Sequence, residues 1–330
     1  MPRSEATERG KDAVGRRRLL AGIGVIRPDL GGKTRGDRVF RLLTVCSALV
    51  LLLLLAGIAL ELWSASGLSI HHSSLPFVWG RTWNPITLTF GALPFLYGTL
   101  VTTLIALVIA APAGVAIAIY LVEMAPRRLR GSLSFLVELL AAVPSVVFGL
   151  WGIFVFIPWL RNTVEIPLSL HLGFIPLFTG PAYGPGMLAA GLILAIMVLP
   201  TVAAISRDVL LAVSKDQRDA ALALGSTRWE MIRNVVLPAG RQGIVVAIGL
   251  GIGRALGETI ATTMVIGNTP QISASLLSTG YTLSSVVANE FTEASTPVYL
   301  SALMEIALVL FAITLVVNIL ARLVVWRGYR

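Results

Sequence analysis

Two charged residues, Arg254 and Glu258, lie four positions apart in a stretch of small and apolar residues. On one helix this spacing places both side chains on the same face. Each charge at the centre of a membrane helix costs about 2.5–3.5 kcal/mol on insertion scales, so two charges on one helix require a reason. One interpretation is an ion pair that braces the helix. We favour the other, a charged lining on a substrate path, because ionisable residues inside a membrane usually mark such a path.

The composition predicts that the helix carrying this pair crosses a membrane. Hydrophobic residues form 56% of the chain and charged residues only 13%, about half the charged share of a soluble domain. Six segments are long and apolar enough to cross a bilayer, which takes about 20 helical residues. The chain is therefore predicted to be an all-α integral membrane protein. The spans are expected at Leu43–Trp63, Tyr97–Val122, Leu133–Trp159, Gly186–Ser206, Gly243–Gly267 and Tyr299–Val325.

The segment before the first span, residues 1–41, is basic and lacks apolar periodicity. We expect a largely disordered tail, followed by one membrane domain over residues 42–330. Tail and first span are both too long for a cleaved signal peptide, so the span should remain as an anchor. Basic residues in the tail could bind RNA or a protein, but membrane topology and attraction to anionic lipid explain them better. No nucleic-acid partner is expected.

The positive charges predict the orientation of the spans. Of the 26 Lys and Arg residues, only Arg81 and Arg161 fall in the loops on one side. Arg254 lies inside a span, and all the others lie before the first span, in the two loops of the opposite side or at the C-terminal end. By the positive-inside rule, both termini and the 207–242 loop are cytoplasmic.

Prolines suggest which spans are enclosed. Pro112, Pro144 and Pro200 lie inside the second, third and fourth predicted spans. A proline frees a carbonyl that, in lipid, only neighbouring helices, Ser/Thr side chains or water can satisfy. We therefore expect these spans inside the bundle. The first span contains the leucine run 51–55 and no proline, which predicts a lipid-facing helix.

The fifth predicted span repeats glycine at every fourth position, at Gly249, Gly253 and Gly257. Such a ridge of small residues allows another helix to approach closely, so we expect these glycines to be helix-packing residues. A nucleotide-binding interpretation of the G-x-G pattern fails because no strand precedes it.

The 207–242 loop carries a spaced pattern. Asp219, Ala220, Ala221 and Gly225 are followed, at the end of an aliphatic stretch, by the pair Leu237-Pro238. The pattern resembles the EAA loop of ABC-importer permeases, with Asp219 where that family usually has Glu. The resemblance implies that the loop docks into a separate ATPase subunit.

Two cap patterns predict the shape of this loop. Ser214 with Gln217, and Thr227 with Glu230, match the capping box, and Gly225 between them can end the first helix in a left-handed turn. The expected result is a helix, a sharp turn and a second helix. An amphipathic hairpin on the inner leaflet is the alternative. We favour docking because the full spacing matches.

Three further segments extend the resemblance to the phosphate-importer permeases of the PstC type. R-A-L-G-E-T at 254–259 resembles their R-A-x-G-E-T signature. P-S-V-V-F-G-L-W-G at 144–152 and G-A-L-P-F-L-Y-G-T-L at 91–100 are similar to two other family segments. The resemblance implies a type I importer permease fold in a bacterial cell membrane. It also implies four kinds of partner: inorganic phosphate, a PstA-type second permease, two PstB-type ATPase subunits that hold ATP-Mg, and a PstS-type extracytoplasmic binding protein.

The same resemblance assigns roles to residues. Arg254, Glu258 and Thr259 are expected along the substrate path, and Pro144 and Gly149 are expected to pack the third span. The planar fork of arginine matches phosphate oxygens better than lysine does. One arginine cannot neutralise phosphate fully, so we expect help from the partner permease or from broken-helix N-termini. Glu258 would hold Arg254 when the path is empty.

Four other acids lie at or inside the predicted spans. Glu138 and Glu305 are buried by position, and pairing and function are equally good interpretations for them. Glu61 and Glu123 lie at span ends and are expected at the membrane interface.

The remaining reactive residues suggest no metal, cofactor or active site. Cys46 is the single cysteine, so an intrachain disulfide is excluded. His71, His72 and His171 have no further ligand at metal-binding spacing. The chain has no Walker A pattern, so ATP hydrolysis is expected elsewhere.

Functions of other classes were weighed against this interpretation. An intramembrane protease would need a catalytic constellation inside the spans, and they contain no His or Asp. A secondary transporter would show two related halves, and no internal repeat is present. Permeases for sulfate or molybdate are the nearest rivals, since only the family signature separates these oxyanions from phosphate.

Overall fold

The computed structural model describes residues 35–73 and 76–327. Within these residues the protein is helical, with one isolated bridge between Asn84 and Thr89 and no strand. Six helical runs there are long and apolar enough to cross a membrane, which confirms the predicted number of spans. They are Gly36–Ala65, Leu93–Met124, Ser145–Leu172, Met187–Ala212, Arg228–Gly257 and Pro297–Leu323.

The chain divides into two compact units, residues 1–57 and 58–330. The described part of the first unit is the larger part of α2 (Arg35–Ala65), a helix without proline. The predicted tail, 1–41, falls mostly outside the described residues, and its last part, 35–41, belongs to α2.

The second unit contains the rest of α2 and the other described helices, and the label η marks short π-helical turns and one 3₁₀ turn. In chain order these are α3 (Gly67–Ser73), α4 (Pro76–Trp79), α5 (Leu93–Ile119), η1 (Tyr120–Met124), α6 (Arg127–Ala142), α7 (Ser145–Trp151), η2 (Gly152–Phe156), α8 (Ile157–Leu160), η3 (Arg161–Glu165), α9 (Ile166–Leu172), η4 (Pro176–Phe178, a 3₁₀ turn), α10 (Met187–Ala212), α11 (Lys215–Ala223), α12 (Arg228–Met231), η5 (Ile232–Val236), α13 (Leu237–Gly257), α14 (Ile260–Val265), α15 (Leu283–Glu290) and α16 (Pro297–Arg327).

α10 is the most enclosed span of this unit. In the most apolar 18-residue stretch of α10, 61% of the residues are buried, whereas in the corresponding stretch of each other span at most 33% are buried. It packs against α5 and α13, and small residues allow the approach: a Cβ on Gly191 would lie 2.7 Å from Ile105 Cβ. Pro200 is buried inside α10 as predicted, whereas Pro112 of α5 is exposed.

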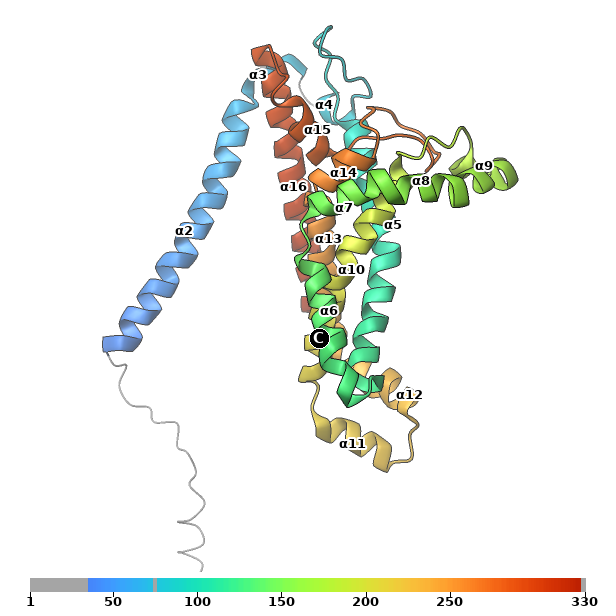
Figure 1. Cartoon of the computed structure of the whole chain (residues 1–330). Coiled ribbons are helices and arrows are strands. Elements are labelled where there is room, and N and C mark those ends of the chain that lie inside the picture. Colours follow the sequence, from blue (N-terminus) through green and yellow to red (C-terminus); the bar gives the residue numbers. More distant parts are fainter. Residues whose placement is uncertain (1–34, 74–75, 328–330) are drawn as a thin grey trace, which may run out of the picture. The chain divides into compact units, whose positions relative to one another are not determined.

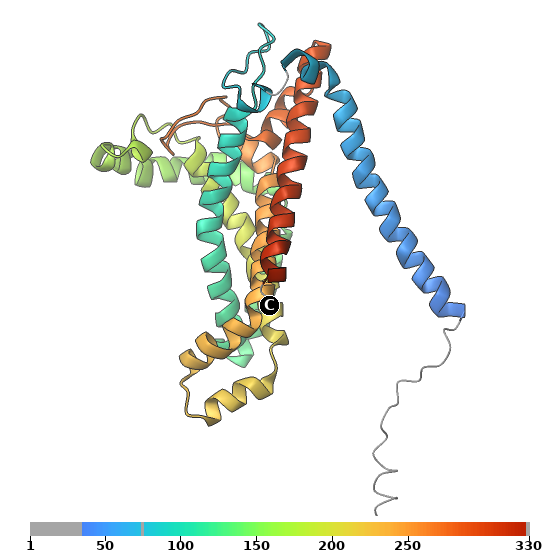
Figure 2. The same ribbon diagram turned by 180° about the vertical axis from the view of Figure 1, so that it is seen from behind.

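The second unit has two distinct ends (Figure 1). α11, α12 and the C-terminal end of α16 lie at one end, and α4, α9 and α15 lie at the other. The view from behind shows the same arrangement, with α5 and α16 running between the two ends (Figure 2). By sequence Arg81 follows α4 and Arg161 lies between α8 and α9, and these helices are at the end away from α11 (Figure 1).

The third predicted span, Leu133–Trp159, is wrong as a single helix. α6 ends at Ala142, and Val143 and Pro144 are both extended, with ψ of 128° and 141°. The cause is local, because a residue before proline is disfavoured in the helical region. A second helical run, α7 to α9, begins at Ser145 and lies across the end of the bundle (Figure 1, Figure 2).

Gly149 lies where this broken segment approaches α14 closely. A Cβ there would lie 2.4 Å from the Sδ atom of Met264 and 3.4 Å from the Cα atom of Ala261, both in α14. Pro144 is exposed and acts as the residue that breaks the helix.

Only part of the predicted glycine ridge of α13 packs against another helix of this chain. A Cβ on Gly249 would lie 3.1 Å from Ala321 Cβ of α16, and one on Gly253 would lie 4.0 Å from Asn318 Nδ2. A Cβ on Gly257 would meet no described atom within 4 Å. The packing predicted for Gly257 is therefore not made by the described part of this chain.

A second row of glycines on α13 makes the closer approach. A Cβ on Gly243 would lie 2.5 Å from Val209 side-chain atoms, and one on Gly251 would lie 2.9 Å from Val202 Cγ2. Both valines belong to α10, so this face of α13 is the one that contacts the central span. The eight-residue separation of the two glycines, two helical turns, is the signal that sequence reasoning overlooked.

Candidate functional site

α11 begins at the predicted cap residue and ends at the predicted glycine, but of the capping box expected at Ser214 only one bond is made among the described residues. The Oγ atom of Ser214 accepts a hydrogen bond from the Gln217 amide at 3.4 Å. At the other end Gly225 has a φ of +85°, its amide donates to Leu222 O at 3.0 Å, and the Ser226 amide donates to Ala221 O at 3.2 Å. These two bonds form a Schellman motif, which satisfies the last carbonyls of the helix.

α12 begins with the predicted capping box. Thr227 Oγ1 accepts from the Glu230 amide at 3.3 Å, and Glu230 Oε2 accepts from the Thr227 amide at 2.8 Å. The second helix is not a separate element, however, because α12 continues through η5 into α13. Leu237 and Pro238 begin α13 directly after the π turn η5, so the proline lies inside this continuous helical run. The turn at Gly225 is thereby connected directly to the fifth span.

The two alanines of the EAA-like pattern face different ways. Ala221 is the buried residue of α11 and packs in a cluster with Leu210, Met231 and Val236. Ala220 is exposed, as are Asp219 and Gly225, and large apolar side chains are exposed beside them. Leu224 is 88% exposed and Trp229 is 63% exposed. These exposed residues of α11, the turn and α12, which we call the loop surface, suit contact with another protein.

Arg254 and Glu258 do not lie on one continuous helix. α13 ends at Gly257, Glu258 is extended with a ψ of 122°, and α14 starts at Ile260. The predicted single span Gly243–Gly267 is therefore wrong. The i, i+4 ion pair is absent as well: among the described residues the ion pairs are Arg207–Glu138, Arg207–Asp208 and Arg218–Glu123. The expectation that Glu258 holds Arg254 is thus not met in this structure.

Each member of the pair has a different partner. Arg254 is half-buried, and its Nη1 atom donates to Thr201 Oγ1 of α10 at 2.8 Å. Glu258 Oε1 accepts from the Ala261 amide at 3.3 Å, so this side chain caps the first turn of α14. We expected the N-terminus of a broken helix to help Arg254 bind phosphate. The N-terminus of α14 lies at such a break, but one of its amides, that of Ala261, already donates to Glu258.

The R-A-L-G-E-T segment forms a supported helix break. The carbonyl of Glu258 accepts from Ser284 Oγ at 2.8 Å and from Thr262 Oγ1 at 2.8 Å. Thr259 is half-buried, and its Oγ1 donates to Gly257 O at 3.1 Å. Bonds from α14 and α15 thus hold the irregular backbone in place, which is the condition for non-helical backbone at membrane depth.

Two of the other acids are now placed. Glu138 is 54% exposed, so the expectation that it is buried is wrong; it pairs with Arg207 at 2.9 Å, which favours the pairing interpretation for it. Glu305 is only 7% exposed, and its Oε2 has no hydrogen-bond partner among the described residues. Neither observation assigns a function to Glu305.

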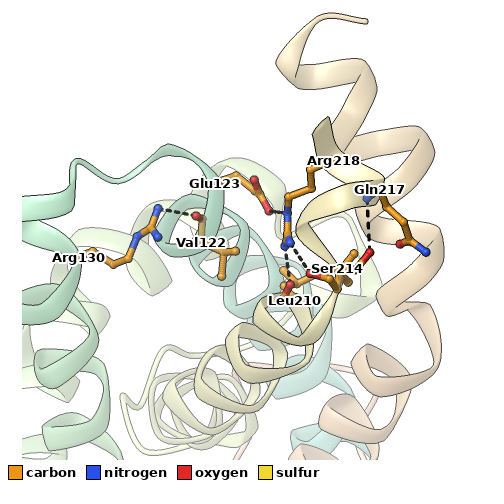
Figure 3. Close-up of polar contacts among 8 residues, drawn as sticks. Val122, Glu123, Arg130, Leu210, Ser214, Gln217 and Arg218 are labelled. Carbon is orange, nitrogen blue, oxygen red and sulfur yellow. Dashed lines mark hydrogen bonds and ion pairs between the residues drawn. The ribbon is translucent and has the colours of Figure 1, made fainter. Parts of the chain in front are cut away.

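Sequence reasoning missed one ionic contact. Glu123 was expected at the membrane interface, but its Oε1 accepts from Arg218 Nε at 2.9 Å and its side chain is only 9% exposed (Figure 3). Arg218 precedes the EAA-like pattern by one position and carries no sequence signal of its own. Only the fold brings the two residues together, across 95 positions.

Comparison with known proteins identifies the family. The sequence model of the binding-protein-dependent transport system inner membrane component matches residues 110–327. The chain belongs to this family. The match covers the helix break at Pro144, the loop surface and the R-A-L-G-E-T segment.

Relatives of known name cover most of the chain. It is 43% identical over 296 residues to the phosphate transport system permease protein PstC of Mesorhizobium japonicum, covering 88% of this chain and 90% of the relative. It is 43% identical over 295 residues to the PstC protein of Pasteurella multocida, covering 88% and 92%. It is 38% identical over 306 residues to PstC 2 of Mycobacterium tuberculosis, covering 90% and 94%.

Solved structures agree with the predicted fold. An inward-facing structure of the MetNI methionine ABC transporter aligns with a TM-score of 0.53 at 18% identity, covering 76% of this chain and 100% of that one. A bacterial alginate ABC transporter aligns with a TM-score of 0.54 at 14% identity, covering 88% and 95%. The fold is that of a type I ABC importer permease, as the sequence resemblance implied.

Proposed function

We propose that this chain is the permease subunit of an ATP-driven importer of inorganic phosphate and forms half of its translocation path. The observation that carries the proposal is 43% identity, over 88% of the chain, to a phosphate transport system permease protein. The family membership and the type I permease fold agree with it.

The chemistry of the helix break supports an anionic substrate. Phosphate at neutral pH carries a charge of roughly −1 to −2 and presents several acceptor oxygens. Arg254 is half-buried and has no carboxylate partner among the described residues; its bond to the neutral Thr201 leaves most of its donors for another ligand. Its charge at this depth is therefore compensated best by an anion. The remaining phosphate charge would be met by the PstA-type second permease.

The loop surface supports contact with the ATPase subunits. Leu224 and Trp229 expose apolar area at the very end of the second unit, on a turn held by a Schellman motif and a capping box. A rigid apolar knob of this kind can transmit movement, because α12 continues through η5 into α13 and only the two extended residues Val213 and Ser214 separate α11 from α10. ATP-Mg would be bound and hydrolysed in these PstB-type partners, and phosphate would be delivered by a PstS-type binding protein at the opposite end.

The proposed orientation places the loop surface and both termini in the cytoplasm of a bacterial cell. Reporter fusions after residue 180, at the end near α9, should give a periplasmic signal, and fusions after residue 225 should give a cytoplasmic one. The physical reason is the positive charge on the side of α11, which resists translocation. The reverse pattern would contradict the orientation and the assignment of the ATPase contact with it.

The direct test of the function is uptake of radiolabelled phosphate. Cells that lack their own high-affinity phosphate uptake should regain ATP-dependent uptake when this chain is expressed with its partner subunits, and not when this chain alone is omitted. Excess unlabelled phosphate should compete, whereas sulfate and molybdate should not. Competition by sulfate or molybdate, with no competition by phosphate, would reassign the substrate to another oxyanion.

A further inference from the structure

One guanidinium joins three elements at the base of the loop surface. Arg218 lies in α11, and its Nε atom donates to Glu123 Oε1 of η1 at 2.9 Å. Its Nη2 atom donates to Leu210 O at 2.6 Å, and its Nη1 atom donates to Val213 O. Figure 3 shows these bonds converging on Arg218 from η1, from the end of α10 and from the link before α11.

The backbone at this point offers carbonyl oxygens to such a donor, although Leu210 O also accepts from the Val213 amide at 3.3 Å. The last carbonyls of a helix have no partner inside the helix. α10 ends at Ala212, and only Val213 and Ser214 separate it from α11. The fork of Arg218 reaches back over this short link to the carbonyls of Leu210 and Val213 and uses a different nitrogen for each of them and for Glu123, whereas a lysine has one nitrogen for all three acceptors. The side chain thus caps α10 and fastens α11 to it at once.

Little else holds α11 against the spans. Ala221 is its one buried residue in the described structure, and an alanine buries only a small apolar area. The polar contact, by contrast, is well enclosed: the side chains of Arg218 and Glu123 are 16% and 9% exposed. Enclosed pairs are screened by salt much less than surface pairs. Removing one partner leaves an uncompensated charge in a poorly solvated place.

The opposite side of η1 is held as well. Arg130 of α6 donates from Nη2 to Val122 O at 2.6 Å, next to Glu123 (Figure 3). The turn that carries Glu123 is therefore tied to both α6 and α11. α10 also leads from this point to Thr201, which accepts the hydrogen bond of Arg254. Leu210 and Thr201 are nine residues apart, about 14 Å along a helix.

We propose that Arg218 and Glu123 form a latch that makes α11 move as one body with the ends of α5 and α10. Arg218 is a positioning residue in this view. It carries displacement of the loop surface into α10, and α10 carries it to the Thr201–Arg254 contact. The latch deepens the proposed function and rests on it for the role in transport, whereas the anchoring of α11 is a property of this chain alone.

The test combines hydrogen exchange with transport. Three variants break the latch: Arg218→Gln, Glu123→Gln and the double variant. Arg218→Lys retains the charge without the fork and serves as the milder change. Glu138→Gln is the matched control, because it also removes one carboxylate from an arginine pair, but Glu138 is 54% exposed and Arg207 keeps Asp208.

In the first measurement, the full-length chain in lipid nanodiscs is followed by amide exchange. The amides of residues 218–224 should exchange at least about tenfold faster in Arg218→Gln, because α11 loses its main tie to the spans. Arg218→Lys should lie between Arg218→Gln and the unaltered chain, and Glu138→Gln should match the unaltered chain. If the two residues act as one unit, the double variant should exchange no faster than the single ones. Unchanged exchange in both Arg218→Gln and Glu123→Gln would overturn the latch.

In the second measurement, the assembled importer in proteoliposomes gives phosphate transported per ATP hydrolysed. The latch variants should still bind the ATPase, and this ratio should fall roughly two- to thirtyfold. A ratio equal to that of the unaltered importer, despite faster exchange, would overturn the positioning role. If the unaltered importer does not transport phosphate, the proposed function fails, and the exchange measurement still decides whether the latch exists.

Discussion

Uptake of phosphate should be lost when Arg254 is replaced by Gln, although the importer still assembles. Arg254 has no acidic partner among the described residues, so its removal leaves no unpaired buried carboxylate to destabilise the fold. A hydrogen bond to a charged group contributes about 1.5–3 kcal/mol, so transport at low phosphate should fall at least about tenfold. Arg254→Lys should also transport poorly because it keeps the charge but loses the planar fork.

Arg241→Gln is the matched control for this prediction. Arg241 lies on the same helix, α13, but is exposed. The Arg241→Gln variant should show normal expression, assembly and phosphate uptake. The measurement is uptake of radiolabelled phosphate, with co-purification of the partner subunits as the check on assembly. Full uptake by an Arg254→Leu, Glu258→Gln double variant would remove both residues from the substrate path and leave only a structural role at the helix break.

A valine at Gly225 should leave the protein in the membrane but weaken its association with the ATPase. The φ of +85° at this position is rare for residues with a side chain, and forcing it costs roughly 1–2 kcal/mol. A Cβ there would meet no described atom within 4 Å, so the expected defect comes from backbone strain and not from a clash. The strain would open the Schellman turn and misplace Leu224, which is 88% exposed beside it.

Two other substitutions isolate this cause. Gly225→Asn should retain most of the association, because asparagine tolerates the left-handed region better than other residues. Gly131→Val is a control in α6, where an added Cβ also meets nothing within 4 Å but φ is not positive. The measurement is the amount of ATPase subunit that is pulled down with each variant. Normal pull-down and normal uptake by Gly225→Val would show that the turn does not position the loop surface.

Patterns that act over a few residues were predictable from the sequence. The caps at Ser214 and Thr227 and the left-handed turn at Gly225 appear where the residue types require them. These elements depend on hydrogen bonds between near neighbours, so the local sequence contains all the information. The number of spans was predictable for a similar reason, since each needs only length and apolar content.

Where the helices break was not predictable in the same way. Hydropathy cannot distinguish a continuous span from two segments joined by an extended residue, so it predicts a single helix for each of the segments 133–159 and 243–267. Proline at 144 contained a signal for the first break. The second break has no proline and is held by Ser284 and Thr262, whose hydroxyls reach the carbonyl of Glu258.

The break at Gly257 and the packing of the helices decided the partners of the charged residues. A four-residue spacing predicted a contact between Arg254 and Glu258. Because the helix breaks after Gly257, Arg254 instead donates a hydrogen bond to Thr201, and Glu258 accepts one from the amide of Ala261. The fold likewise joins Glu123 to Arg218. The sequence by itself determined which charged residues enter the membrane domain. The packing of the helices determined which group compensates each charge, because an ionic contact acts over a few ångströms in space, whatever the separation of the two residues along the chain.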